Sequence, residues 1–222
     1  MTRKPTQMPT VDVPPLKTGM RMDRETFHRV YCLHPEIKKA ELIDGVVYVA
    51  SPVTLIHSDP HASLITWCGM WAAYNPHTRI SDNITVLMDG KEFQPDMVLS
   101  IRPTHGGRVG FSSELYMTGS PELIGEIAVS SEALDIGPRM ETYRSGGVGE
   151  YIIWRVLSQR IEWYVLRDGQ YVLLPADDAG IVRSEAFAGL WLDVPAMLSE
   201  NMLAVLTTLR AGIAAQASAG QP

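Results

Sequence analysis

Three carboxylates stand in segments whose sequence otherwise predicts buried β-strands. Glu126 is the only charge in an apolar run, Asp96 heads a second run, and Glu41 opens a third. Because alternate side chains of a strand share a face, Glu126 is expected to lie with Ile124 and Ala128. A lone carboxylate on an apolar face costs several kcal/mol unless it is paired or binds a metal ion.

Carboxylates from separate strands are suited to one hard cation. Mg²⁺ takes oxygen ligands, keeps several waters and needs only one or two carboxylates, and Mn²⁺ is the expected substitute. Each residue also has a simpler interpretation. Glu126 would pair with an arginine across the sheet, Asp96 would cap a neighbouring element, and Glu41 would be a solvated charge at a strand edge. The spacing alone leaves these alternatives open.

The surrounding pattern predicts an α/β protein with a central mixed sheet of roughly six strands. An Asp-Gly pair between two β-prone runs predicts a hairpin over residues 40–50. Residues 102–119 are expected to form a loop. The other predicted strands lie at 84–88, 96–101, 122–129, 150–156, 161–166 and 170–174, and the predicted helices at 22–31, 56–74, 135–144 and near 202–213.

Length and composition predict a single domain. We expect a disordered N-terminal arm at residues 1–20, one domain at 21–212 and a flexible tail at 213–222. Hydrophobic residues make up 45% and charged residues 20% of the 222 positions, which excludes wholesale disorder. No run of about 18 apolar residues predicts a membrane span. A polar N-terminus and two cysteines without metal-site spacing predict a cytoplasmic protein.

An ordered series of short motifs runs through the chain. Its members are Glu-Leu-Ile-Asp-Gly at 41–45, Ser-Pro at 51–52 with His57, Gln-Pro-Asp at 94–96, Pro-Glu-Leu-Ile-Gly-Glu-Ile-Ala-Val-Ser-Ser at 121–131, Asp135, Tyr143, and Gly-Val-Gly-Glu-Tyr-Ile-Ile-Trp at 147–154. The series resembles the Uma family of endonucleases, a bacterial branch of the PD-(D/E)xK, restriction-endonuclease-like superfamily. The resemblance covers about residues 22–210. It implies an αβββαβ core with an added C-terminal hairpin and helix, and an active site at one sheet edge.

The resemblance also implies roles for particular residues. Asp96 would be the metal ligand of the Pro-Asp motif and Glu126 the second acidic ligand, with the carbonyl of Ile127 completing the set. Glu41 would be oriented towards the metal or its water. The superfamily's usual lysine, two residues after the acid, is replaced here by Ala128.

In the Uma family this lysine moves to the following helix, at the position of Arg139. An arginine stays protonated, so Arg139 would hold a scissile phosphate but would be a poor general base. The alternative is a surface ion pair with Asp135, four residues earlier on the same predicted helix.

Basic and imidazole side chains offer further candidates for contact with nucleic acid. His57 and His61 have the spacing of a metal-binding pair, but no third His or Cys ligand is evident nearby. His57 matches a family position and is a candidate for contact with phosphate or the water network. Arg102 and Arg108, in the predicted loop, would meet the nucleic-acid backbone or be ordinary solvated charges.

These residues favour a divalent-metal-dependent endonuclease that hydrolyses DNA, weakened by Arg139 and needing no small organic cofactor or membrane. The alternative is a non-cleaving nuclease-fold module that binds nucleic acid or a protein partner. A hydrolase of another phosphorylated substrate is a third hypothesis, because fold does not fix function. A homodimer is one expected assembly, since two-fold symmetry suits cutting both strands. The net charge of −6 argues against a protein that coats nucleic acid non-specifically.

Overall fold

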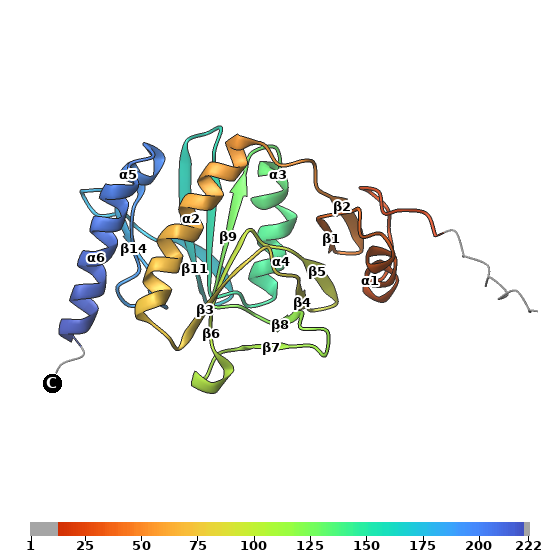
Figure 1. The fold of residues 1–222 in the computed structure, drawn as a ribbon, viewed down its shortest axis with the longest axis horizontal. Coiled ribbons are helices and arrows are strands. Elements are labelled where there is room, and N and C mark those ends of the chain that lie inside the picture. The colour runs from red at the N-terminus through yellow and green to blue at the C-terminus, as the bar shows by residue number, and fades with distance from the viewer. Residues whose placement is uncertain (1–12, 220–222) are drawn as a thin grey trace, which may run out of the picture.

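A computed structural model describes residues 13–219 and is built around one six-stranded mixed sheet (Figure 1). The order of its strands is β12-β11-β10-β9-β6-β3. Only the β9–β10 pair is parallel among these neighbours. The predicted central mixed sheet is therefore confirmed. The strands are β3 (Thr78–Asp82), β6 (Met97–Ile101), β9 (Leu123–Ala128), β10 (Glu150–Arg155), β11 (Arg160–Arg167) and β12 (Gln170–Leu173).

A second six-stranded sheet, in the order β2-β1-β5-β4-β8-β7, was not predicted. Two of its strands and a 3-10 turn at Pro103–His105 lie inside residues 102–119, so the expectation of a plain loop is wrong. Strands of three residues are too short to display a two-residue period. The members are β1 (Ala40–Ile43), β2 (Val46–Val49), β4 (Val86–Met88), β5 (Lys91–Phe93), β7 (Val109–Phe111) and β8 (Met117–Gly119).

Helices flank the sheets, and one of them differs from its prediction. The expected helix at 135–144 is two helices, broken at Ile136 and Gly137. Pro138 explains the break, because proline disfavours helical geometry at the residue before it and is tolerated at the first helical position. The helices are α1 (Arg24–Leu33), α2 (Leu55–Tyr74), α3 (Glu132–Asp135), α4 (Pro138–Ser145), α5 (Val194–Leu198) and α6 (Met202–Ala219), and β13 (Ile181–Arg183) pairs with β14 (Trp191–Asp193).

The two faces of β9 enter different cores, as the two-residue period requires. Leu123 and Ile127 belong to a core shared with α2 and α6. Ile124 and Ala128 belong to a core shared with α4 and the second sheet. Figure 1 shows α2 between α6 at one end of the molecule and β1, β2 and α1 at the other. Glu126 therefore lies on the face of β9 that meets α4 and the second sheet.

Local signals set the ends of the N-terminal elements. Asp23 caps α1 by accepting a hydrogen bond from the backbone N–H of Thr26 at 2.9 Å. Asp44 and Gly45, with φ of 49° and 74°, form the tight turn between β1 and β2. Both φ values are positive, as the favoured two-residue hairpin turns require. The predicted hairpin is confirmed.

The described ends of the chain extend past the predicted domain boundaries. Leu16 is buried against α1 and β2, and the N–H of Gly19 donates to the carbonyl of Val47 at 2.8 Å. Residues 1–12 of the predicted arm, and 220–222 of the predicted tail, lie outside the described residues. The last helix continues beyond the expected boundary at 212. Within residues 13–219, no helix is both long and apolar enough to span a bilayer.

Candidate active site

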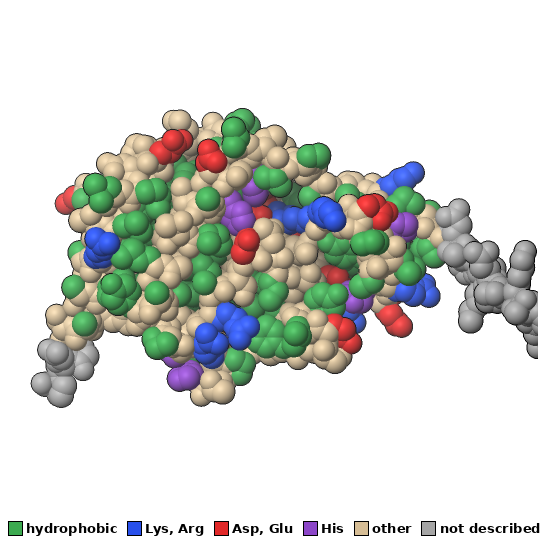
Figure 2. Space-filling view, viewed as in Figure 1, with side chains coloured by type: hydrophobic (Ala, Val, Ile, Leu, Met, Phe, Trp, Pro, Cys, Tyr) green, Lys and Arg blue, Asp and Glu red, His purple; other side chains and the backbone are tan. Residues whose placement is uncertain are grey.

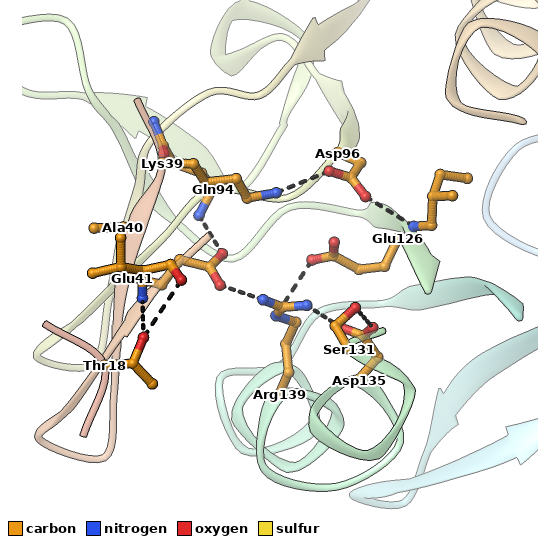
Figure 3. Close-up of polar contacts among 12 residues, drawn as sticks. Thr18, Lys39, Ala40, Glu41, Gln94, Asp96, Glu126, Ser131, Asp135 and Arg139 are labelled. Atoms are coloured by element: carbon orange, nitrogen blue, oxygen red, sulfur yellow. Dashed lines mark hydrogen bonds and ion pairs between the residues drawn. The ribbon is translucent and has the colours of Figure 1, made fainter. Parts of the chain in front are cut away.

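The four predicted catalytic side chains meet at one cavity of about 520 Å³. Glu41 comes from β1, Asp96 from the residue before β6, Glu126 from β9 and Arg139 from α4. The pairing of Met97 with Gly125 extends naturally to bring Asp96 beside Glu126. Figure 2 shows imidazole, acidic and basic side chains around a hollow on this face, and Figure 3 shows the carboxylates turned towards one another.

Asp96 is buried and held on both carboxylate oxygens. Its Oδ1 accepts a hydrogen bond from Lys39 Nζ at 2.8 Å. Its Oδ2 accepts one from the backbone N–H of Ile127 at 2.9 Å and lies 3.2 Å from His57 Nε2. Burial opposes ionisation, but the hydrogen bond with His57 and the charge of Lys39 together hold the pKa of Asp96 below its usual value. This carboxylate is therefore ionised and fixed in direction.

Glu126 is 1% exposed and lacks a full counter-charge. The hydroxyl of Tyr143 donates to its Oε1 at 2.5 Å, and Arg139 Nε lies 3.7 Å from the same oxygen. Within the described part of the chain, no hydrogen bond reaches Oε2. Burial raises the pKa of Glu126 to about 8; Arg139 acts to lower it, and the neighbouring charge of Asp96 raises it further. Two adjacent acids, one of them reluctant to ionise, are what a divalent cation would stabilise.

Arg139 is buried among carboxylates. Nη2 contacts Glu41, Nη1 contacts Asp135, and Nε faces Glu126. Burial disfavours its charge, yet the three carboxylates raise its pKa well above the usual value. The predicted ion pair with Asp135 is present, but its expected place on the surface of one helix is wrong, because both residues are buried and lie in α3 and α4. Carboxylates lie on three sides of the guanidinium (Figure 3). Arg139 therefore mainly neutralises the negative charge of these carboxylates and does not extend into the cavity.

Glu41 faces the cavity but is not free to bind a cation. Its Oε1 accepts from the backbone N–H of Gln94 at 2.9 Å, and its Oε2 contacts Arg139. Across residues 13–219, no group of three or more His, Cys, Asp or Glu side chains is placed to hold a metal ion. Asp96 Oδ1 is held only by the side chain of Lys39, and Glu126 Oε2 accepts no hydrogen bond among the described residues, so these two carboxylates are the candidates for binding a cation, a number that suits Mg²⁺.

Sequence reasoning missed Lys39, which lines the cavity beside Asp96. Burial acts to lower its pKa, but the charges of Asp96, Glu126 and Glu41 raise it above the usual value, so its ammonium stays charged. A signal was present in the sequence. Lys39 stands two residues before Glu41, so the period of an extended strand places both side chains on one face.

The two histidines of α2 lie at the cavity near Asp96. His57 contacts the carboxylate of Asp96, and His61 Nε2 lies 2.7 Å from the backbone oxygen of the same residue. His61 Nε2 also lies 3.0 Å from Asp82 Oδ1. The four-residue spacing of the two histidines therefore places both rings against Asp96, one at its carboxylate and one at its backbone oxygen.

The two predicted loop arginines lie away from the cavity. Arg102 Nε donates to the carbonyl of Pro76 at 3.0 Å. Arg108 donates to the carbonyls of Gly147 and Pro121 at 2.9 and 3.1 Å, and Nε contacts Glu122. Neither lines the cavity. Both guanidinium groups tie loops to their neighbours.

A family model described as "Putative restriction endonuclease" matches residues 24–195, which include every residue of this cavity except Thr18. The chain belongs to the Uma2 family. The predicted resemblance is confirmed, and membership in the Uma2 family together with the fold supports a nuclease-type function.

A solved structure supports the assignment of the fold. The chain is similar to a protein from Anabaena variabilis titled "putative nuclease belonging to DUF820", with a TM-score of 0.65 and 14% identity. The similarity covers 80% of this chain and 98% of the other. No curated protein matches this chain. At this low identity the similarity confirms the predicted nuclease-like fold class and nothing finer.

Proposed function

We propose that this chain is a divalent-metal-dependent phosphodiesterase that hydrolyses DNA. The observation that carries the proposal is the pairing of an ionised, oriented Asp96 with Glu126, whose pKa is raised to about 8, in one cavity. Acids whose pKa values are strongly perturbed and that line a cleft are candidates for a functional site. A divalent cation gives both carboxylates a reason to lie together on an otherwise apolar sheet.

The residues present fit Mg²⁺ or Mn²⁺. Asp96 and Glu126 would hold the ion, with the carbonyl of Ile127 as the proposed third ligand. When bound, such an ion supplies an activated water and neutralises charge that develops on the phosphate. Asp96 is aimed by the N–H of Ile127 and by His57, so its orientation does not depend on the substrate.

Arg139 and Glu41 form a supporting pair at the same cavity. Arg139 joins Glu41, on β1, to Asp135, on α3, and so links the second sheet to the helices beside β9. Glu41 is fixed from the other side by the backbone of Gln94. This pair sets the shape and charge of the cavity wall, and in the proposed mechanism Glu41 would orient a water beside the metal ligands.

A cleavage assay tests the proposal. Plasmid DNA and single-stranded DNA are incubated with the protein in Mg²⁺, in Mn²⁺ and in EDTA. Cleavage is expected only with a metal ion. Asp96→Asn is expected to abolish cleavage, while its thermal unfolding still shows the transition of a folded protein. Full activity in Asp96→Asn, or cleavage in EDTA, would overturn the proposal.

A second candidate is a module that binds nucleic acid or a protein without cleaving. It is favoured by the commitment of Arg139 to three carboxylates and by the lysine ammonium that already contacts Asp96. Calorimetry separates the two candidates. Mn²⁺ binding that depends on Asp96 supports the phosphodiesterase, whereas DNA binding that is indifferent to Mn²⁺ and cleavage-free supports the module.

A further inference from the structure

The cavity holds two strongly basic side chains whose commitments differ. Among the described residues that line it, the lysines and arginines are Lys39 and Arg139. Arg139 is buried and directed at three carboxylates. Lys39 is 24% exposed at its side chain and makes one hydrogen bond, to Asp96 Oδ1. An ammonium has three donors, so Lys39 can accept a further anionic partner without losing its place in the cavity.

The two oxygens of Asp96 differ in how easily a partner can leave. Oδ2 is held by the backbone N–H of Ile127, inside β9, which has no freedom to move away. Oδ1 is held by Lys39 alone, through a long and flexible side chain. A cation that approaches Asp96 from the cavity would therefore displace the contact with Lys39 and not the contact with Ile127.

A released Lys39 ammonium would remain beside the reacting group. The charges of Glu126 and Glu41 attract it to the same cavity. A phosphodiester that binds there brings negative oxygens within reach of that ammonium. Arg139 is not placed to do this work, because its guanidinium faces Glu41, Asp135 and Glu126.

We propose that Lys39 exchanges from Asp96 to the scissile phosphate when the divalent ion binds, and so acts as the phosphate-binding cation of the site. The inference rests on the proposed phosphodiesterase function. Lys39 lies outside the series of short motifs, and it would make the contact with phosphate that Arg139 does not make. Asp96 is thereby occupied by a cation in either state, first by the ammonium and then by the metal.

Lysine footprinting on the wild-type protein tests the exchange. Acetylation by acetic anhydride is quantified by mass spectrometry with and without Mg²⁺, at constant ionic strength. Lys38 is the internal control, because it is exposed and adjacent in sequence, and its ammonium donates to the carbonyl of Pro35 and contacts no carboxylate among the described residues. Mg²⁺ is expected to raise Lys39 acetylation about fivefold, the factor that matches loss of an ion pair of about 1 kcal/mol. Lys38 is expected to stay constant.

Variants test the phosphate contact. Lys39→Gln should slow single-turnover cleavage at saturating Mg²⁺ about 100-fold, as for loss of one donor to developing charge, while binding Mn²⁺ more tightly in calorimetry. Lys38→Gln carries the same charge change and should match the wild type in both measurements. Lys39→Arg keeps the charge and should restore part of the rate.

The outcomes separate this inference from the function beneath it. If Mg²⁺ binds in an Asp96-dependent way but Lys39 acetylation does not change, the exchange is overturned and the phosphodiesterase stands. Weaker Mn²⁺ binding in Lys39→Gln would make Lys39 an anchor for Asp96, and would also overturn the exchange. If the wild type binds no divalent ion, both proposals fall. The acetylation measurement uses only the wild-type protein, so it tests the exchange even if Lys39→Gln does not fold.

Discussion

Glu126→Gln is expected to make the metal-free protein more stable at neutral pH. The pKa of Glu126 is about 8 in the fold, against an ordinary 4.5. The folded state therefore keeps a proton that the unfolded chain has released between these two pH values. The stability of the protein with protonated Glu126 is fully present below pH 4.5. As pH rises from 4.5 towards 8, keeping this proton in the fold progressively lowers the free energy of unfolding.

The magnitude follows from the same two values. One pH unit corresponds to about 1.4 kcal/mol, so at pH 7 the cost of Glu126 is about 3 kcal/mol. Glutamine has the same shape and still accepts the hydrogen bond from Tyr143, but it carries no proton to lose. We expect Glu126→Gln to gain close to this amount at pH 7 and little at pH 4.5.

Urea unfolding with EDTA, at several pH values from 4.5 to 8, measures this difference. Glu200→Gln is the matched control, since it removes the same charge from an exposed residue. The advantage of Glu126→Gln should grow with pH, whereas the control should track the wild type. In Mn²⁺ the order should reverse, because only the wild type retains the second carboxylate ligand. A Glu126→Gln protein that is no more stable than wild type at pH 7 would refute the reasoning.

Two further substitutions separate support from chemistry. Arg139→Lys should lower the free energy of unfolding by about 3 kcal/mol, because a lysine ammonium does not span the three carboxylates that the guanidinium contacts. For the same reason it should not raise the cleavage rate. Urea denaturation measures the first effect and a plasmid cleavage assay the second. Glu150→Ala should also cost about 3 kcal/mol, since this buried carboxylate accepts hydrogen bonds from Trp163 and from backbone N–H groups. Calorimetry should find its Mn²⁺ affinity unchanged, and a loss there would count against a purely structural role.

The sequence predicted the elements that carry long or strongly marked patterns. The apolar alternation around Glu126 located β9 and its two faces, and the Asp-Gly pair located the first hairpin. Strands β5, β7 and β8 of the second sheet were not predicted, because three residues carry too little periodicity, and the pairing of β1 with β5 and of β4 with β8 joins segments that are distant in sequence. The break before Pro138 was readable from the proline and was missed.

The site was predicted as a set of residues and not as a set of contacts. Asp96, Glu126, Glu41 and Arg139 meet at one cavity, as the motif series implied. Sequence could not assign partners within it, since Arg139 could equally face solvent, substrate or carboxylates. Lys39 escaped notice because its only sequence signal was a two-residue offset from Glu41. Contacts of this kind depend on how two sheets pack, which no local pattern specifies.

A divalent cation shared by Asp96 and Glu126 is the central feature of the proposed function. Anomalous diffraction from a crystal soaked in Mn²⁺ at pH 8, where Glu126 is ready to ionise, tests this directly. We predict an anomalous peak bonded to one oxygen of each carboxylate, with Lys39 moved off Asp96. A cavity without a peak, or Mn²⁺ bound only elsewhere on the chain, would contradict the account.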